Sequence, residues 1–241
     1  MQKQSKSNHL RINQYIALTG VCSRRQADLY IIQRRVRVNQ ANAVPGMKIE
    51  EGDIVTLDGK RISPSRSLYL ALNKPKGYTC TAQDRHAEKK VSDLLPPSMG
   101  RLFTVGRLDR DSRGLLIVTN DGAFAQRIAH PKYTVEKEYI ATIIPVFRLE
   151  DSKKIIAGIE DNDELLRAKT VTILSQLQEK SILSIILTEG KKRQLRRIFS
   201  ALHYHILDLQ RIRIGTLSLR ALPEGTYRTL SSKEIKNLSR S

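Results

Sequence analysis

Two acidic residues lie among arginines in the stretch VGRLDRDSRGLL, residues 105–116. They are Asp109 and Asp111, in a chain that has 42 Lys and Arg against 24 Asp and Glu and a net charge of +18. One interpretation is that the acids pair with neighbouring arginines in a surface loop, which we expect for Asp111. The other is that the arginines keep Asp109 ionised, because an ionised carboxylate in a pocket can act as a nucleophile at an anomeric carbon. The three arginines of the stretch are Arg107, Arg110 and Arg113.

Metal and cofactor sites are not expected. The spacing D-x-D-x-x-G that begins at Asp109 resembles a calcium loop. However, Arg113 occupies its fifth position, where an oxygen ligand is required, and Asn120 its twelfth, where a bidentate Glu is required. His203 and His205 form an H-x-H pair that could bind a metal, although strand alternation or a solvated turn explains them better. The sequence has no phosphate-binding loop and no dinucleotide fingerprint, so we expect no cofactor.

The excess of positive charge indicates a polyanionic partner, and nucleic acid is the best candidate. We see no basic amphipathic helix for a membrane surface and no apolar run of 18 residues for a membrane span. The two cysteines, Cys22 and Cys80, have no paired spacing, and the N-terminus has no apolar stretch typical of a secretory signal. We therefore expect a cytoplasmic protein that does not bind membranes, and nothing suggests more than a monomer.

A linker is expected at SPSRS, residues 63–67, because serine and proline punctuate structure there. We predict a disordered lead-in over 1–8, a small domain over 9–63 and a larger domain over 64–241. In the small domain, Gly20 should end a first helix that buries Ile12 and Ile16, and Ser23 should cap a second one with Gln26. Short strands should follow at VRVN and DIVTL.

Five arginines of the small domain should face outward, and we favour a phosphate-binding face over a merely solvated surface. This domain resembles the alpha-L RNA-binding module of a small-subunit ribosomal protein in Arg11 and in the stretches SRRQAD (23–28), VRVN (36–39) and GDIV (52–55). A glycine is usual before RVRVN, and Arg34 stands there, so we expect the local turn to differ. The five arginines are Arg24, Arg25, Arg34, Arg35 and Arg37.

The larger domain alternates between strand and helix patterns without regular βαβ spacing, which indicates an α+β fold with a mixed, mainly antiparallel sheet. The best helix is predicted over 193–204, where Leu195, Ile198, Phe199 and Leu202 share one face. Strands are expected at SLYLALNKP, LLIVTN and KEYIATII, and AKTVTILSQ should pair with SILSIILTEG.

The stretch GRLDRDSRGLLIVTNDG, residues 106–122, closely resembles the signature of the bacterial ribosomal RNA pseudouridine synthases of the RsuA/RluB/RluE/RluF group. The resemblance covers residues 9–235 and implies an enzyme that isomerises uridine in RNA without a cofactor. Four companion stretches support it in the right order: LNKPKGY (72–78), EKEY (136–139), TEGKKRQLRRIF (188–199) and LQRIRIG (209–215).

The resemblance also implies roles for individual residues. Asp109 matches the catalytic aspartate, Tyr139 the tyrosine that stacks on the target uracil, and Arg196 the basic residue that pairs with the aspartate. Helix geometry agrees with the choice of Arg196, because it borders the apolar stripe while Arg197 faces solvent. Further residues implied in substrate binding are Arg107, in the space left by the flipped base, Leu209, lining the uracil pocket, the motif residues Lys74 and Lys137, and Lys192 and Arg193 at phosphates, with Arg24, Arg25 and Arg34 of the small domain.

The identity of the target RNA stays open at this stage. We favour one uridine of large-subunit ribosomal RNA, either free or in a ribosomal assembly intermediate. Small-subunit ribosomal RNA and tRNA are alternatives that need the same catalytic residues. A non-catalytic RNA-binding or ribosome assembly factor would need only the basic surface.

Overall fold

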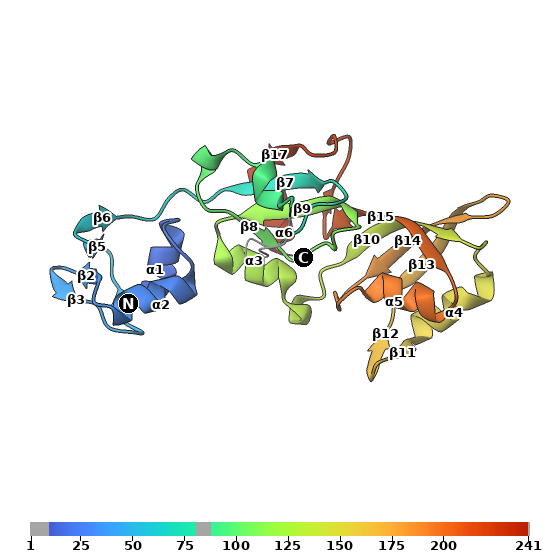
Figure 1. The fold of residues 1–241 in the computed structure, drawn as a ribbon, viewed down its shortest axis with the longest axis horizontal. Coiled ribbons are helices and arrows are strands. Elements are labelled where there is room, and N and C mark those ends of the chain that lie inside the picture. The colour runs from blue at the N-terminus through green and yellow to red at the C-terminus, as the bar shows by residue number, and fades with distance from the viewer. Residues whose placement is uncertain (1–9, 81–87, 241) are drawn as a thin grey trace, which may run out of the picture. The chain divides into compact units, whose positions relative to one another are not determined.

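The computed structural model describes residues 10–80 and 88–240 of the 241-residue chain (Figure 1). The expected lead-in over 1–8 lies outside the described residues. The described residues divide into two compact units, one made of 10–67 and 97–102 and the other of 68–80, 88–96 and 103–240. The first boundary follows Ser67, the last residue of SPSRS. In the part of the chain that is described, no helix is long and apolar enough to cross a bilayer.

The first unit packs two short helices against small antiparallel sheets. Helix α1 spans Ile12–Leu18 and α2 spans Arg24–Ile32. The predicted Ser23 cap is present, because Ser23 Oγ accepts from the Gln26 backbone N–H at 3.1 Å, but the Gln26 side chain does not complete the capping box. The sheets have the orders β3-β2-β5-β6 and β1-β4. Their strands are β1 (Leu10–Arg11), β2 (Val36–Val38), β3 (Ala41–Asn42), β4 (Lys48–Ile49), β5 (Val55–Leu57) and β6 (Lys60–Ile62).

Arg34 adopts the left-handed conformation that a glycine would take easily, with φ +57°. The arginine itself takes the left-handed conformation, so a different backbone conformation at this position, which was expected, is not found. For a residue with a Cβ this conformation costs about 1–2 kcal/mol. The side chain of Arg34 is exposed, so no packing inside the unit offsets this cost.

The second unit is built on a nine-stranded sheet with the main order β13-β14-β10-β15-β9-β7-β17, while β16 pairs with β15 and β8 with β9. Every strand pair is antiparallel except β15 with β9, so the predicted α+β class is confirmed. The strands are β7 (Tyr69–Lys74), β8 (Phe103–Val105), β9 (Arg113–Thr119), β10 (Lys137–Ile144), β13 (Thr170–Gln176), β14 (Ser181–Leu187), β15 (His205–Ile214), β16 (Leu217–Ser218) and β17 (Tyr227–Thr229), with a separate hairpin of β11 (Ile159–Asp161) and β12 (Glu164–Leu166).

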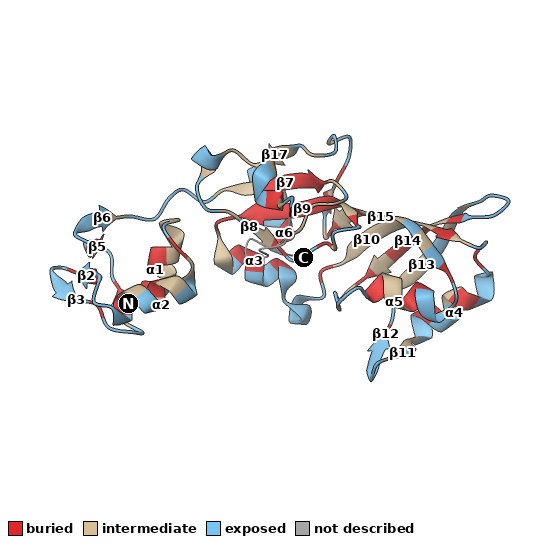
Figure 2. Ribbon diagram, in the orientation of Figure 1, coloured by how far each residue is buried: buried red, intermediate tan, exposed pale blue. Residues whose placement is uncertain are grey.

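Two apolar cores cover different parts of this sheet. One joins α4 (Leu149–Ala157) and α5 (Gln194–Ala201) to β10 and β14, and the other joins α3 (Gly122–Ala129) and α6 (Ser232–Leu238) to β7 and β9. Figure 2 shows buried residues along β7 and β9 and on α5. Helix α5 ends three residues earlier than predicted, because His203 turns to φ +64°.

The two cores meet at a seam where β9 and β15 run parallel. Only two register pairs join these strands, Gln210 with Arg113 and Arg211 with Gly114. Gly114 has φ +108°, and a Cβ on it would lie 2.3 Å from the Arg211 carbonyl oxygen. The two backbones therefore approach closely only because residue 114 is glycine.

Replacing Gly114 with alanine should destabilise the second unit by about 3 kcal/mol, through a clash with fixed backbone and a strained φ. Gly225→Ala is the matched control, because φ there is +80° but the nearest heavy atom to a new Cβ, Pro75 Cγ, is 3.7 Å away. Urea unfolding followed by circular dichroism should show a much smaller loss for Gly225→Ala. Equal losses would mean that the close approach at the seam is unimportant.

Candidate active site

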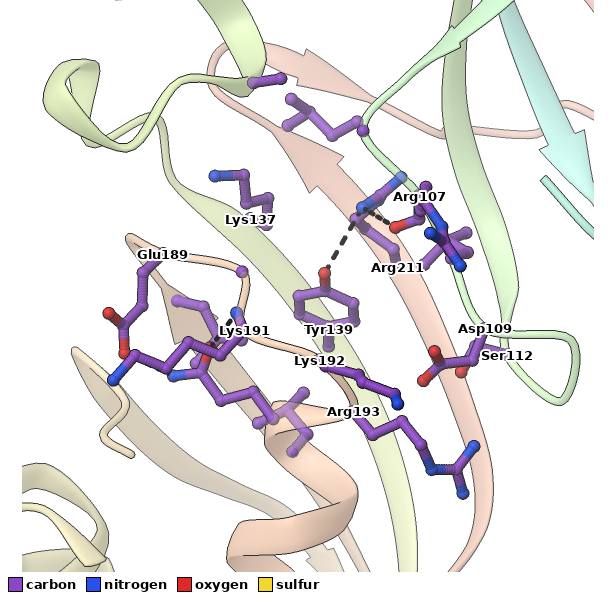
Figure 3. A pocket seen from close by; sticks show the side chains of 18 of the residues that line it. Arg107, Asp109, Ser112, Lys137, Tyr139, Glu189, Lys191, Lys192, Arg193 and Arg211 are labelled. Carbon is purple, nitrogen blue, oxygen red and sulfur yellow. Dashed lines mark hydrogen bonds between the residues drawn. The ribbon is translucent and has the colours of Figure 1, made fainter. Parts of the chain in front are cut away.

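A pocket of about 670 Å³ lies at the seam of the second unit. This volume falls within the range of about 300–1,000 Å³ that is typical of small-molecule sites. The loop after β8, strands β10 and β15, and the loop that leads into α5 line it (Figure 3). Segments that are distant in the sequence thus meet at one place.

Asp109 is half-buried in this pocket, and its carboxylate faces the open space in Figure 3. Among the described residues, this carboxylate forms no ion pair or hydrogen bond. Its backbone carbonyl accepts from the Ser112 N–H at 3.1 Å, which closes a turn around the residue. The predicted arrangement, with Asp109 held between neighbouring arginines, is therefore not found.

The arginines and the second acid of this stretch have other partners. Arg113 lies at the start of β9 and binds Asp208 of β15, with its Nη2 2.8 Å from Oδ2. Asp111 is exposed, and its closest basic partner is Arg193, at 3.9 Å. The expected pairing of Asp111 with a neighbouring arginine of its own stretch is not found. Arg113 instead binds a carboxylate that strand pairing brings from far along the chain.

Lys74 holds the Asp109 loop from inside the protein. Its side chain is fully buried, and its Nζ donates to the carbonyls of Ser112 at 2.6 Å, Pro75 at 2.9 Å and Arg110 at 3.4 Å. Burial lowers the pKa of this amine from its ordinary value. The predicted contact between Lys74 and substrate is therefore wrong: Lys74 shapes the loop and does not reach the pocket surface.

Tyr139 lines the pocket from β10, and Arg211 lies beside it on β15. The Arg211 side chain is buried, and its Nε donates to the Leu115 carbonyl at 2.8 Å. Its Nη1 lies 3.4 Å from both the Tyr139 hydroxyl and the Arg107 carbonyl (Figure 3). Arg211 is not among the site residues predicted from the sequence, although the stretch LQRIRIG contains it.

Arg196 lies on α5 at the pocket, where its Nη2 donates to the Asp111 carbonyl at 3.1 Å. Its Nε is buried and has no partner among the described residues. In this structure the predicted pair with Asp109 is not formed. Arg197, expected to face solvent, instead binds Asp161 and Glu164 of the β11–β12 hairpin.

The loop before α5 carries further basic side chains to the pocket. Gln194 is buried and positions this loop: its Oε1 accepts from the Lys191 N–H at 3.0 Å, and its Nε2 donates to Glu189 at 2.7 Å. Lys192 and Arg193 are exposed and point toward Asp109 in Figure 3.

The remaining predicted residues of the second unit also line the pocket. Lys137 is half-buried on β10, and burial, followed by the positive charge of Arg211, lowers the pKa of its amine. Leu209 is buried, while Arg107 is exposed at the edge. In all, seven basic side chains and two acidic ones line the pocket, which makes it suited to a polyanion.

Three predicted binding residues, Arg24, Arg25 and Arg34, are exposed on the first unit and are not part of this pocket. Arg35, in the same cluster, forms a two-pronged ion pair with Asp58, with bonds of 2.9 and 2.6 Å. It is therefore engaged within its own unit.

No three His, Cys, Asp or Glu side chains in residues 10–80 and 88–240 come together as they would around a metal ion. His203 lies in a turn and His205 begins β15, and both are exposed.

The fold and the pocket define a class of protein. The profile of the RNA pseudouridylate synthase family matches residues 68–201, and that of the S4 domain matches residues 10–55. The chain belongs to the RNA pseudouridylate synthase family, with an RNA-binding S4 domain at its N-terminal side. It is therefore an enzyme that isomerises uridine in RNA, which confirms the predicted family and sets aside a purely RNA-binding role.

Individual relatives are similar to this chain over nearly its whole length. Ribosomal large subunit pseudouridine synthase B of Bacillus subtilis (strain 168) is 34% identical over 95% of each protein. Dual-specificity RNA pseudouridine synthase RluF of Escherichia coli (strain K12) is 34% identical over 95% of this chain and 78% of its own. A solved structure described as a pseudouridylate synthase is 30% identical, with a TM-score of 0.69 over 95% of this chain and 99% of that one.

Lys74→Met should remove the part of the pH dependence of the unfolding free energy that comes from the buried Lys74 amine. Because the folded pKa of Lys74 is lowered, the unfolded chain binds more protons between that pKa and the ordinary value of 10.5. The free energy of unfolding of the wild type should therefore rise relative to that of Lys74→Met as the pH increases through this window. Urea unfolding at several pH values measures the difference, and parallel curves would contradict the assignment.

Proposed function

We propose that this protein converts one uridine of ribosomal RNA to pseudouridine, with Asp109 as the nucleophile. The observation that carries the proposal is a half-buried carboxylate, without a partner among the described residues, that faces a basic pocket beside Tyr139. Such a carboxylate faces the space that a bound nucleotide would occupy, where it can act as a nucleophile.

The reaction needs no oxidant, reductant or cofactor. Asp109 attacks either the ribose anomeric carbon or the uracil ring, and the bond between N1 and C1′ breaks. The detached uracil turns and rejoins C1′ through C5, and the bond to Asp109 breaks, which restores the free carboxylate. The C5 proton leaves, and N1 takes up a proton. Atoms and charge balance, so the product is an isomer of the starting nucleotide.

The other pocket residues have complementary roles in this proposal. Tyr139 stacks on the flipped uracil and helps to remove the C5 proton, and Leu209 packs against the ring. Arg196 turns from the Asp111 carbonyl toward Asp109 when RNA is bound. Arg107 fills the space that the flipped base leaves. The phosphates of the strand are bound by Lys192 and Arg193, with Lys137 further inside.

Large-subunit ribosomal RNA is the target we propose. The name of the Bacillus subtilis relative supports this choice, because that protein is described as acting on the large ribosomal subunit. Under this proposal the protein works as a monomer in the cytoplasm, on free RNA or on an assembly intermediate. The S4 domain adds affinity through exposed arginines that bind phosphates.

Asp109→Asn should abolish turnover while RNA affinity changes little, because phosphate contacts dominate affinity. Asp111→Asn is the matched control, since its side chain is exposed and its one ion pair among the described residues is with Arg193, at 3.9 Å. Release of tritium from C5-labelled uridine in ribosomal RNA transcripts measures turnover, and filter binding measures affinity. Activity in Asp109→Asn, or a parallel loss of affinity, would contradict the nucleophile assignment.

Arg34→Gly should stabilise the first unit by about 1 kcal/mol, because it relieves the left-handed strain. It should also weaken RNA binding and reduce the slope of log affinity against log salt by about 1.

Gln40→Gly is the control, because Gln40 is also exposed and left-handed, with φ +71°, but carries no charge. It should gain similar stability and leave the salt slope unchanged. Identical salt slopes for both variants and the wild type would mean that Arg34 does not bind phosphate.

A further inference from the structure

Buried polar atoms without partners gather at the active-site pocket. The described residues contain five such side-chain atoms, and three of them, Ser112 Oγ, Arg196 Nε and Arg211 Nη2, belong to residues that line this pocket. Buried polar groups in proteins nearly always have a hydrogen-bond partner. The cluster therefore indicates that a ligand completes these bonds. Because both nitrogen atoms are donors, the ligand must offer acceptor oxygens.

Arg211 is the more enclosed of the two arginines, with only 4% of its surface exposed, whereas Arg196 is half-buried. Its orientation is fixed by the 2.8 Å bond from Nε to the Leu115 carbonyl, and Nη1 faces the Tyr139 hydroxyl. No carboxylate of the described residues forms an ion pair with it.

Arg213, two residues along the same strand, provides the contrast. Its guanidinium binds Glu136 at 3.2 Å and Glu138 at 2.8 Å. Arg213 is thus neutralised by the protein itself, and it does not line the pocket. A buried guanidinium that lacks such compensation is costly to keep. The fold nevertheless keeps the buried guanidinium of Arg211 next to Tyr139, without a carboxylate partner among the described residues.

We propose that Arg211 binds the detached uracil and stabilises its negative charge, with Nη2 donating to a ring carbonyl oxygen. This inference rests on the function proposed above. Whichever atom Asp109 attacks, the electron pair of the broken N1–C1′ bond leaves with the ring. The resulting negative charge spreads over N1 and the carbonyl oxygens, and it disappears once C5 has joined C1′, the C5 proton has left and N1 is protonated.

The position of Arg211 suits the base better than a phosphate. Arg107, Lys192 and Arg193 are exposed, so the RNA backbone can reach them, whereas Arg211 is buried beside the ring of Tyr139. Its guanidinium is already held in place, so little reorganisation is needed when charge develops. An interaction of this kind is strongest after the bond breaks, and it raises the rate more than the affinity.

The test compares Arg211→Gln with Arg213→Gln on unmodified transcripts of both ribosomal RNAs that carry C5-tritiated uridine. Single-turnover tritium release gives the rate, and filter binding over a salt series gives the affinity. For Arg211→Gln we expect a rate loss of about 100-fold or more, with affinity within about threefold and an unchanged salt slope. Arg213→Gln should react at nearly the wild-type rate.

Two results would overturn the proposal. One is a rate for Arg211→Gln within about threefold of the wild type, where removal of an electrostatic donor should cost far more. The other is a parallel loss of rate and affinity with a salt slope smaller by about 1, which would identify a phosphate contact. If the wild type itself releases no tritium from either RNA, whether as transcripts or in assembling ribosomal subunits, the proposed function fails; if only the Arg211 effect is absent, that function stands.

Arg211→Lys covers the case in which Arg211→Gln does not fold. Lysine keeps the positive charge, but one ammonium group cannot serve both the Leu115 carbonyl and the pocket. We expect the rate of Arg211→Lys to fall about tenfold at unchanged affinity, because one charge-stabilising hydrogen bond is weakened and not removed. A wild-type rate in Arg211→Lys would overturn the role of the guanidinium.

Discussion

The close approach of β9 and β15 at Gly114 and Arg211 is the constraint on which the site depends. In the sheet register, Arg211 lies opposite Tyr139 of β10 on one side and Gly114 of β9 on the other. Strand β15 therefore sets the distance between the tyrosine and the loop that carries Asp109. A side chain at position 114 would meet the Arg211 backbone at 2.3 Å and push these parts of the site apart.

Ion pairs elsewhere in the second unit leave the pocket with an excess of positive charge. Asp208 is engaged by Arg113 and Lys76, and these hydrogen bonds lower the pKa of its carboxyl although burial opposes them. Other acids pair with basic side chains that do not line the pocket, as Glu136 does with Lys169 at 2.6 Å. The pocket is thus basic although the unit contains acids, because several of them are bound by basic side chains outside it. Asp109 remains available.

The sequence predicts local structure well where a pattern repeats over several residues. The apolar spacing of Leu195, Ile198 and Phe199 identifies α5, and alternation identifies β10 and the pair of β13 with β14. It does not identify the parallel contact of β9 with β15, because that contact joins residues about a hundred positions apart and involves only two register pairs. Helices α3, α4 and α6 are short, and they were missed.

The same limit applies to the site. The motifs single out Asp109, Tyr139 and Arg196, but they say nothing of which charges pair. The partner of Arg113 is 95 residues away, so spacing along the chain suggested Asp111 instead. The motifs assign Lys74 to substrate binding and give Arg211 no role, and only the fold shows that both are buried. Whether a cation touches solvent, backbone or ligand is decided by tertiary packing.

The most direct test of the central claim is a map of pseudouridine in both ribosomal RNAs by carbodiimide labelling and primer extension. Cells would carry the native gene, a deletion, or the gene for Asp109→Asn. We predict one stop in large-subunit RNA that is present with the native gene and missing in both altered strains. Identical stops in all three strains would contradict a ribosomal RNA target for this enzyme.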